Sequence, residues 1–540
     1  MRYQVPFVPL LCAAAATGLL VAKIFDSAPY TVLSSSLGVG LAAYTLYTSY
    51  VYPFYVSQLR HIPTVPGCPL WGHFFAIITS ECGIPAREWH ANYGGVVRYF
   101  FPFSAERLSI ADDEAIKQMT VKNPYNYPKP ARARAWMRPV LGDGVLLAEG
   151  HVHVQQRKAL TPAFSISSIR SLMPVFWEKA LHMANLWEVE MKRASHETKS
   201  FEVLEWLNRA TLDIIGKAGL GTEINSLDNP ETLLRQAYKA CFDFSLQARI
   251  INSLAAFTQL VRLVPSKTNR DIAFARDTIL TRATTIIHQK QVEAAEKKDS
   301  KTKDIIGLIV KDNMTASAED SLTIEAMRDQ VMTFLGAGHD TTATSVAWTL
   351  MLLSKHPAVQ HRLRQEIKEY MPFLFDDAKR FDGDEVTKAD VDLLPYVEHV
   401  CKEALRFIPS IPMTVRQARE DDYMAGYYIP AGTTVYLMAN AINRLESYWG
   451  ATANQFDPDR WRKLPPTYTT NAFMTFLQGP RGCIGRKFAE VEMKALLCSL
   501  LSKFTFELDA TFPDPEELKM WRLVLRPRDG VNLIVRPLKS

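Results

Sequence analysis

The sequence lacks several features that would point to common classes of protein. Its 540 residues contain seven cysteines, which are scattered along the chain and form no CxxC pair. This argues against a disulfide framework and against a cysteine-based zinc site. No Gly-, Ser- or Pro-rich linker interrupts the chain after residue 70, and no repeat of fixed period occurs. We therefore expect one large folded unit rather than a string of small domains.

A strong charge of either sign is also missing. The formal net charge is +5, and the basic residues are interspersed with acidic ones. Because nucleic-acid-binding surfaces concentrate Lys and Arg on one face, we expect no nucleic-acid partner. Hydrophobic residues make up 47% of the chain, which is ordinary for a folded globular protein.

Charge is nearly absent from the N-terminus, where two apolar stretches follow one another. Residues 5–22 are uncharged and end before Lys23, and a second uncharged stretch runs over residues 27–59. A membrane-spanning helix needs about 20 apolar residues, a length that the second stretch meets and the first approaches. We predict that residues 1–60 form a transmembrane anchor with one or two spans. A secretory signal peptide is the alternative for residues 1–25, although it would lack its basic cluster.

The rest of the chain, residues 61–540, reads mainly as helix. Apolar residues recur at i, i+3, i+4 and i+7 in residues 346–372 and 486–503, the spacing of a helix with one buried face. Strand-like segments are fewer, at residues 96–101, 426–437 and 531–535. The expected architecture is a mainly α-helical domain with small peripheral β-sheets.

The strongest local pattern surrounds Cys483. Residues 476–492 read FLQGPRGCIGRKFAEVE, in which Gly and Pro residues form a tight loop just before an amphipathic helix. The N–H groups at the start of that helix, and Arg481 nearby, would stabilise a thiolate. From residue types alone, Cys483 could be a nucleophile, a metal ligand or a buried small side chain.

This segment resembles the F-x-x-G-x-R-x-C-x-G haem-binding signature of the cytochrome P450 family, with matches at Phe476, Gly479, Arg481, Cys483 and Gly485. The resemblance implies the cytochrome P450 fold and a haem b (iron protoporphyrin IX) with Cys483 as its axial thiolate. Such a ligand pushes electron density onto the iron and favours O–O cleavage. It also implies that Arg481 binds a haem propionate and that Phe476 packs beside the ligand loop.

A second match lies in residues 336–342, which read GAGHDTT. Small residues on a helix face commonly reflect close packing alone. Here, however, Ala337, Gly338, Asp340 and Thr341 are similar to the family's oxygen-activation motif A-G-x-[DE]-T. The resemblance implies that Ala337 and Gly338 lie against the haem, and that Asp340 and Thr341 deliver protons through water to dioxygen.

Further matches imply supporting roles. Glu403 and Arg406 lie at i, i+3 and correspond to the family's E-x-x-R, with Arg460 in the sequence FDPDRW as the third member of a structural ion triad. His153 and Arg157 resemble the family's W-x-x-x-R, with histidine in place of tryptophan. Together with Arg416 they are expected to face the haem propionates. Zinc binding by His151 and His153 is discounted because no further ligands accompany them.

The resemblance also implies the partners. We expect electrons from NADPH-cytochrome P450 reductase, with Lys158, Arg462, Arg486 and Lys487 as candidate basic contacts. The other expected partners are O2, membrane lipid and a lipophilic small molecule. The small molecule is expected to be lipophilic because residues 241–264 are apolar enough to form a hydrophobic roof over the site. The positive-inside rule puts the catalytic domain in the cytosol, and the resemblance to membrane-bound family members implies that the membrane is that of the endoplasmic reticulum. Similarity to fungal membrane-bound P450s suggests secondary-metabolite biosynthesis.

Two other functions remain open from the sequence. A P450-fold isomerase, dehydratase or peroxygenase would need no reductase, but such enzymes often lose the acid–alcohol pair that Asp340 and Thr341 form here. A non-catalytic haem-binding or scaffold protein would not require that pair at all. The retained pair favours a haem-thiolate monooxygenase.

Overall fold

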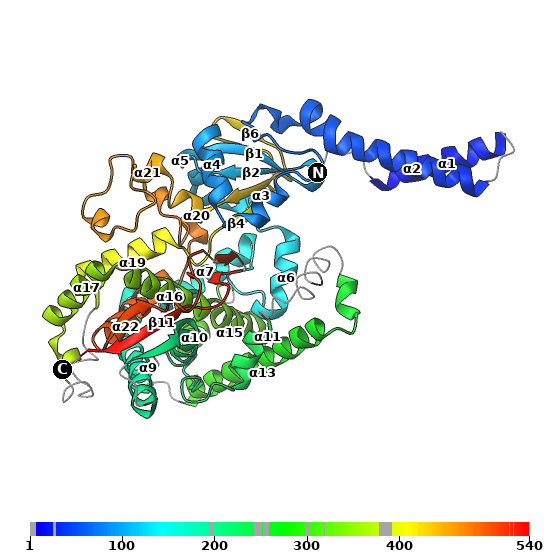
Figure 1. Ribbon diagram of the computed structural model, residues 1–540. Helices are drawn as coiled ribbons and strands as arrows, with labels where there is room; N and C mark the ends of the chain where they lie inside the picture. Colours follow the sequence, from blue (N-terminus) through cyan, green and yellow to red (C-terminus); the bar gives the residue numbers. More distant parts are fainter. Residues whose placement is uncertain are drawn as a thin grey trace.

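The computed structural model describes residues 7–24, 29–194, 198–241, 251, 259–296, 303–317, 319–376, 391–517, 519–521 and 523–538. Figure 1 shows an arm made by the N-terminal helices, a lobe built around the largest sheet, and a larger helical body. The arm projects from the sheet lobe, away from the helical body. The mainly helical architecture with small sheets is confirmed.

The arm contains α1 (Phe7–Ile24) and α2 (Pro29–Leu46), which pack against each other. It continues through the π-helix η1 (Tyr47–Val56) into the sheet lobe. Within the described residues, no helix combines the length and the hydropathy that crossing a membrane requires. The predicted transmembrane anchor over residues 1–60 therefore stays a prediction.

The largest sheet has the strand order β1-β2-β7-β4. Its hairpin of β1 (Val96–Phe101) and β2 (Ala105–Ile110) confirms the strand expected at residues 96–101. The segment expected as one strand at residues 426–437 is two, β6 (Tyr427–Ile429) and β7 (Thr434–Leu437). The remaining strands are β3 (Lys199–Glu202), β4 (Thr414–Gln417), β5 (Asp422–Met424), β8 (Phe504–Leu508), β9 (Lys519–Trp521), β10 (Leu525–Pro527) and β11 (Asn532–Pro537).

The helices of the body follow the apolar periodicity, with one division that the sequence analysis did not predict. The stretch 346–372 belongs to α16 (Asp340–Lys355) and α17 (Pro357–Tyr370), because Pro357 cannot continue a helix but suits the first position of a new one. The stretch 486–503 forms α22 (Arg486–Leu501), as expected. Other helices of the body are α7 (Gly150–Leu160), α8 (Ile166–Ser171), α9 (Met173–Ala194), α10 (Val203–Ile214), α11 (Leu233–Cys241), α13 (Lys267–Glu296), α14 (Ile305–Thr315), α15 (Ile324–Gly338) and α19 (Pro395–Phe407). Shorter helices flank these and the sheet: α3 (Phe74–Thr79), α4 (Ile84–Tyr93), α5 (Asp113–Lys117), α6 (Ala131–Leu141), α20 (Ala439–Ile442) and α21 (Glu446–Trp449).

The core of the body forms around α16, which is buried along most of its length. It packs against α10, α19 and α22. Trp348 on this helix is fully buried, and its indole N–H donates to the carbonyl oxygen of Leu525 at 2.9 Å. A central helix buried on all sides holds its side chains in fixed positions, which is what a site built on it requires.

Candidate active site

The loop that carries Cys483 is held by backbone hydrogen bonds and by one glycine. Gly479 has a φ of +70°, and a Cβ there would come within 2.0 Å of the Thr120 carbonyl oxygen, so only glycine fits. The Cys483 N–H donates to the Phe476 carbonyl oxygen at 2.8 Å. Gly485 has an ordinary φ of −85°. The predicted tight loop before the helix is thus present, and α22 begins three residues after the cysteine.

The Cys483 side chain combines accessibility with a raised pKa. It is accessible, yet burial raises the pKa of the thiol above its usual value. Together these observations indicate a thiol that stays accessible although many protein atoms surround it. The backbone N–H of Gly485 and the cation of Arg157 act in the opposite direction and lower the pKa.

The sequence-based interpretation placed the cation of Arg481 near the thiolate, and that interpretation needs correction. Arg157 lowers the pKa of Cys483, as Arg486 also does, and its Nη1 donates to the Gly482 carbonyl oxygen at 2.6 Å, which holds the guanidinium beside the cysteine loop. The Arg481 side chain instead pairs with Glu149, and its guanidinium carbon lies 4.9 Å from the centre of the Tyr125 ring. A thiol with a raised pKa still becomes a thiolate when a metal cation binds it.

The oxygen-motif segment is divided between two helices. α15 ends at Gly338 and α16 begins at Asp340, while His339 between them keeps helical backbone angles and its carbonyl oxygen accepts from the Ala343 N–H at 3.0 Å. The Thr341 Oγ1 donates to the Ala337 carbonyl oxygen at 2.9 Å, across this break. Ala337, Gly338 and Thr341 are only partly buried on an otherwise buried helix, so one strip of small and polar side chains remains accessible.

This accessible strip lies on the same side of the helix as Phe334, at spacings of three, four and seven residues. The Phe334 ring packs edge-on against Phe164, with ring centres 5.4 Å apart. A Cβ at Gly485, two residues after Cys483, would lie 3.9 Å from the same Phe164 ring. Phe164 therefore connects the cysteine loop to the strip of Ala337, Gly338 and Thr341.

Asp340 lies beside this strip and pairs with Arg526 on β10. The Asp340 side chain is 3% exposed, so its carboxylate depends on a partner inside the protein. The neighbouring His339 is buried, and burial lowers the pKa of its imidazole. Its Nδ1 lies 2.6 Å from the Leu335 carbonyl oxygen and acts as the donor, since a carbonyl only accepts. His339 is thus a packed, neutral side chain.

Near the cysteine loop, a cluster of cations surrounds a single described carboxylate. Lys129, Arg416 and Arg481 influence one another electrostatically, and Glu149 lies among them. Burial and then Arg416 lower the pKa of Lys129 to about 7. Burial and then Arg481 lower the pKa of Arg416 to about 10. Burial causes most of each shift, and repulsion between the cations lowers both pKa values further.

His153 belongs to the same region. Burial, followed by the charges of Arg481 and Lys129, lowers the pKa of its imidazole to about 4, so it is neutral at pH 7. Its Nδ1 lies 3.0 Å from the Tyr125 hydroxyl oxygen, within hydrogen-bond distance. The predicted His153, Arg157, Arg416 and Arg481 thus gather in one region, as expected for residues that share a ligand.

The region fits the anionic side of a haem. Nε and Nη1 of Arg481 and Nε of Arg134 are buried without a hydrogen-bond partner among the described residues. Buried guanidinium donors need an acceptor, and an anion serves them best. Two carboxylates in this place would accept hydrogen bonds from these donors and balance the positive charge of the region. Haem carries two such carboxylates, its propionates. The thiol of Cys483, on the neighbouring loop, is a suitable ligand for the iron.

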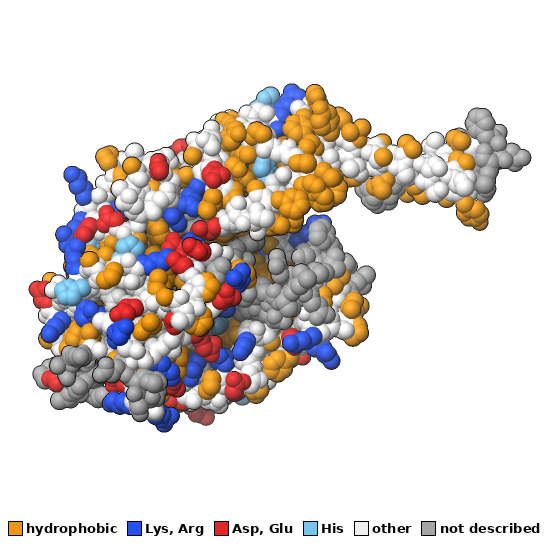
Figure 2. All heavy atoms as spheres, viewed as in Figure 1, with side chains coloured by type: hydrophobic (Ala, Val, Ile, Leu, Met, Phe, Trp, Pro, Cys, Tyr) orange, Lys and Arg blue, Asp and Glu red, His pale blue; other side chains and the backbone are white. Residues whose placement is uncertain are grey.

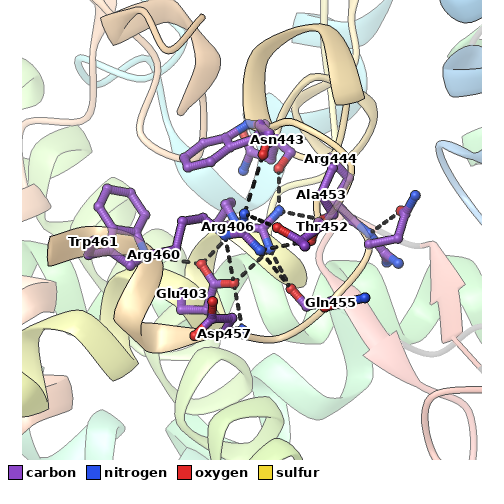
Figure 3. A network of polar contacts seen from close by, with 12 residues as sticks. Glu403, Arg406, Asn443, Arg444, Thr452, Ala453, Gln455, Asp457, Arg460 and Trp461 are labelled. Carbon is purple, nitrogen blue, oxygen red and sulfur yellow. Dashed lines mark hydrogen bonds and ion pairs between the residues drawn. The ribbon is translucent and has the colours of Figure 1, made fainter. Parts of the chain in front are cut away.

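Glu403, Arg406 and Arg460 come together away from this region, in the network that Figure 3 shows. Both guanidinium groups contact the Glu403 carboxylate, with Arg406 Nη2 at 2.7 Å and Arg460 Nε at 3.4 Å. Arg406 also donates to the carbonyl oxygens of three loop residues: Asn443, Ala453 and Gln455. The network ties α19 to the long segment that precedes the cysteine loop, and this supports a structural role.

The basic residues suggested as contacts for a reductase all have acidic partners within the chain. Their ion pairs are Lys158–Asp320, Arg462–Asp459, Arg486–Glu490 and Lys487–Asp392. A partner protein that uses them would have to compete with these carboxylates. Residues 242–250 and 252–258 of the predicted roof lie outside the described residues, so its form is not tested.

Sequence reasoning missed Lys129, Glu149 and Arg526. Each lies far along the chain from the residue with which it interacts, and no local spacing marks it. Arg526, for example, follows Asp340 by 186 residues. Only the fold brings such pairs together.

Comparisons with known proteins agree with the site. A family model described as cytochrome P450 matches residues 63–535. The chain is 33% identical to cytochrome P450 monooxygenase sphH of Aspergillus fumigatus, in a match that covers 95% of this chain and 94% of that protein. It is 32% identical to cytochrome P450 monooxygenase ALT8 of Alternaria alternata, covering 91% and 92%. It is 30% identical to cytochrome P450 monooxygenase FUM15 of Gibberella moniliformis, covering 91% of each protein.

Proposed function

We propose that this chain, which belongs to the cytochrome P450 family and is a P450 monooxygenase, inserts one oxygen atom of O2 into a lipophilic small molecule. NADPH supplies the electrons through a flavoprotein reductase. The cofactor is a haem b with the Cys483 thiolate as axial ligand. The monooxygenase relatives come from fungi, which supports a place in the biosynthesis of a fungal secondary metabolite.

The observation that carries this proposal is the convergence of three features. They are an accessible thiol, a cationic region with guanidinium donors that lack a partner among the described residues, and the accessible strip of Ala337, Gly338 and Thr341. A bound haem would need a ligand for its iron, cations for its propionates and a helix face of small residues that it can approach closely. A scaffold protein would have no use for all three.

When bound, the haem supplies the iron at which O2 is reduced and its O–O bond is cleaved. The chain contributes the protons. Because the Thr341 hydroxyl donates to the Ala337 carbonyl, its oxygen lone pairs remain able to accept a hydrogen bond from water. Asp340, next to it, takes up a proton and passes it through such a water towards the accessible face of the helix.

Thr341→Val tests this assignment, since valine keeps the shape and removes the hydroxyl. With the reductase and NADPH, this variant should release more hydrogen peroxide per NADPH than the wild type. Thr344→Val is a matched control on the same helix, because the Thr344 hydroxyl is buried without a hydrogen-bond partner among the described residues. Equal peroxide release from the two variants would remove Thr341 from proton delivery.

We further propose that residues 61–540 form the catalytic domain, on the cytosolic face of the endoplasmic reticulum membrane, and that residues 1–60 anchor it there. The apolar sequence of this segment supports the proposal. Figure 2 shows hydrophobic side chains gathered where the arm meets the sheet lobe. The exposed hydrophobic side chains of this part of the chain include Tyr50, Tyr55, Leu70, Trp71, Phe75 and Phe103. Aromatic side chains of this kind suit the boundary between lipid and water.

A further inference from the structure

The ion pair between Asp340 and Arg526 joins the proposed proton-delivery acid to the C-terminal hairpin of β9 and β10. The Asp340 side chain is 3% exposed and that of Arg526 is 21% exposed. A carboxylate buried to this degree is costly unless a cation or donors meet it. The Arg526 guanidinium therefore stabilises the Asp340 carboxylate more than an exposed ion pair would, and it restricts the orientation of that carboxylate.

The backbone of the hairpin is tied to the same helix. The Trp348 indole N–H donates to the Leu525 carbonyl oxygen at 2.9 Å, and the Leu525 N–H donates to the Ser410 carbonyl oxygen at 2.7 Å. The Ser410 hydroxyl in turn donates to the Thr341 carbonyl oxygen at 3.0 Å. The residue before Arg526 is thus fixed against both the body of α16 and the proposed alcohol residue.

Two other titratable groups lie near this pair. His339 is neutral, as its lowered pKa and its bond to Leu335 indicate. Glu202 interacts electrostatically with Arg526, and its carboxylate accepts N–H donors from Leu204, Glu205 and Val531. Backbone donors thus engage the Glu202 carboxylate at short range, while the Asp340 carboxylate is in direct contact with the guanidinium.

We propose that Arg526 is a positioning residue for proton delivery: its guanidinium fixes the orientation of the Asp340 carboxylate, so that the C-terminal hairpin sets the efficiency with which Asp340 passes protons. This rests on the proposed role of Asp340. A guanidinium is a planar fork that fixes a carboxylate in one plane, whereas an ammonium keeps the charge without that geometry. Arg526 also has the more accessible side chain of the two.

The test needs no identified substrate. The full-length, haem-loaded protein is combined with the reductase, NADPH and O2, and NADPH oxidation and hydrogen peroxide release are measured in H2O and in D2O. The variants are Asp340→Asn, Arg526→Gln, the double variant Arg526→Gln/Asp340→Asn, and Arg526→Lys. Arg528→Gln is the matched control, because Arg528 lies two residues away and forms an exposed ion pair with Asp529.

Asp340→Asn should lower the rate of NADPH oxidation about 100-fold, which is at the lower end of the effect expected when a general acid is lost. Arg526→Gln should lower it by an intermediate factor of about 10 and raise the solvent isotope effect, because the acid is present but misoriented. Adding Arg526→Gln to Asp340→Asn should have no further effect on the rate. Arg526→Lys should recover part of the loss, and Arg528→Gln should match the wild type.

Each failure has its own meaning. If Arg526→Gln behaves like Arg528→Gln while Asp340→Asn is impaired, or if the effects of Arg526→Gln and Asp340→Asn multiply, the positioning role is overturned. If Asp340→Asn itself is unimpaired, the proposed acid fails. Should Arg526→Gln not fold, as its carbon monoxide spectrum would reveal, Arg526→Lys replaces it in the same cycle. The smaller loss of rate in Arg526→Lys must then also disappear when this substitution is combined with Asp340→Asn.

Discussion

Replacing Glu403 by alanine should destabilise the protein far more than any exposed ion-pair mutation. The Glu403 carboxylate is fully buried and accepts hydrogen bonds from the side chains of Arg406, Arg460 and Trp461 and from the Asp457 N–H. Removing it leaves two buried guanidinium groups without their counter-ion. Breaking a buried ion pair by removing one partner costs about 3–5 kcal/mol.

That cost is a large part of the total stability of a folded protein, about 5–15 kcal/mol. With an m-value of about 3 kcal/mol/M, it lowers the urea midpoint by about 1–1.7 M. The midpoint can be followed by tryptophan fluorescence in detergent-solubilised protein, since Trp449 and Trp461 lie in the network region. Partial destabilisation should also lower the fraction of protein that holds haem.

Glu507→Ala provides the control. Glu507 pairs with Arg536, and both side chains are about half exposed, 52% and 46%. An exposed pair of this kind contributes about 0–1 kcal/mol, so its loss should shift the urea midpoint by about 0.3 M or less at the same m-value. Equal midpoint shifts in Glu403→Ala and Glu507→Ala would refute the structural role of the Glu403 network.

Three further outcomes are expected. Arg481→Gln should weaken haem binding about 10- to 100-fold, because it removes a charged hydrogen bond to the haem. Haem transfer to apomyoglobin measures this loss. A change no larger than that of Arg419→Gln, at an exposed arginine, would contradict the propionate site. Burial raises the pKa of the Glu492 carboxyl well above its usual range. Above about pH 4.3, the Glu492 carboxyl of the unfolded chain therefore loses a proton that the folded chain retains. The free energy of unfolding consequently falls as the pH rises. The free energy of unfolding of Glu492→Gln should therefore exceed that of the wild type by an amount that grows with pH, and a constant difference in urea titrations at several pH values would be contrary to this. Deletion of residues 1–56 should release the protein from membranes in a flotation assay, whereas continued tight binding would place the anchor elsewhere.

The sequence predicted those parts of the site that depend on residues close together in the chain. The loop before α22 follows from its glycines, and the positive φ of Gly479 shows why one of them is needed. The small residues at 337 and 338 likewise mark an accessible helix face. Periodicity predicted the helices but not the break at His339, since the surrounding residues are all compatible with a helix.

Electrostatic partners could not be predicted in the same way. The cations that lower the pKa of Cys483 include Arg157, which is distant in the sequence, whereas the side chain of Arg481, two residues away, pairs with Glu149. Similarly, nothing near Asp340 in the sequence indicates Arg526. Such pairs depend on how distant elements pack, and that packing is not encoded in local spacing.

The most direct test of the central claim is the carbon monoxide difference spectrum of the reduced, haem-loaded protein, for the wild type, Cys483→Ser and the exposed-cysteine control Cys68→Ser. We expect the wild type and Cys68→Ser to show the long-wavelength Soret band of a thiolate-ligated haem, and Cys483→Ser to lose it. A Cys483→Ser spectrum identical to that of the wild type, or a wild type without the thiolate band, would contradict the assignment of Cys483 as the ligand and the mechanism built on it.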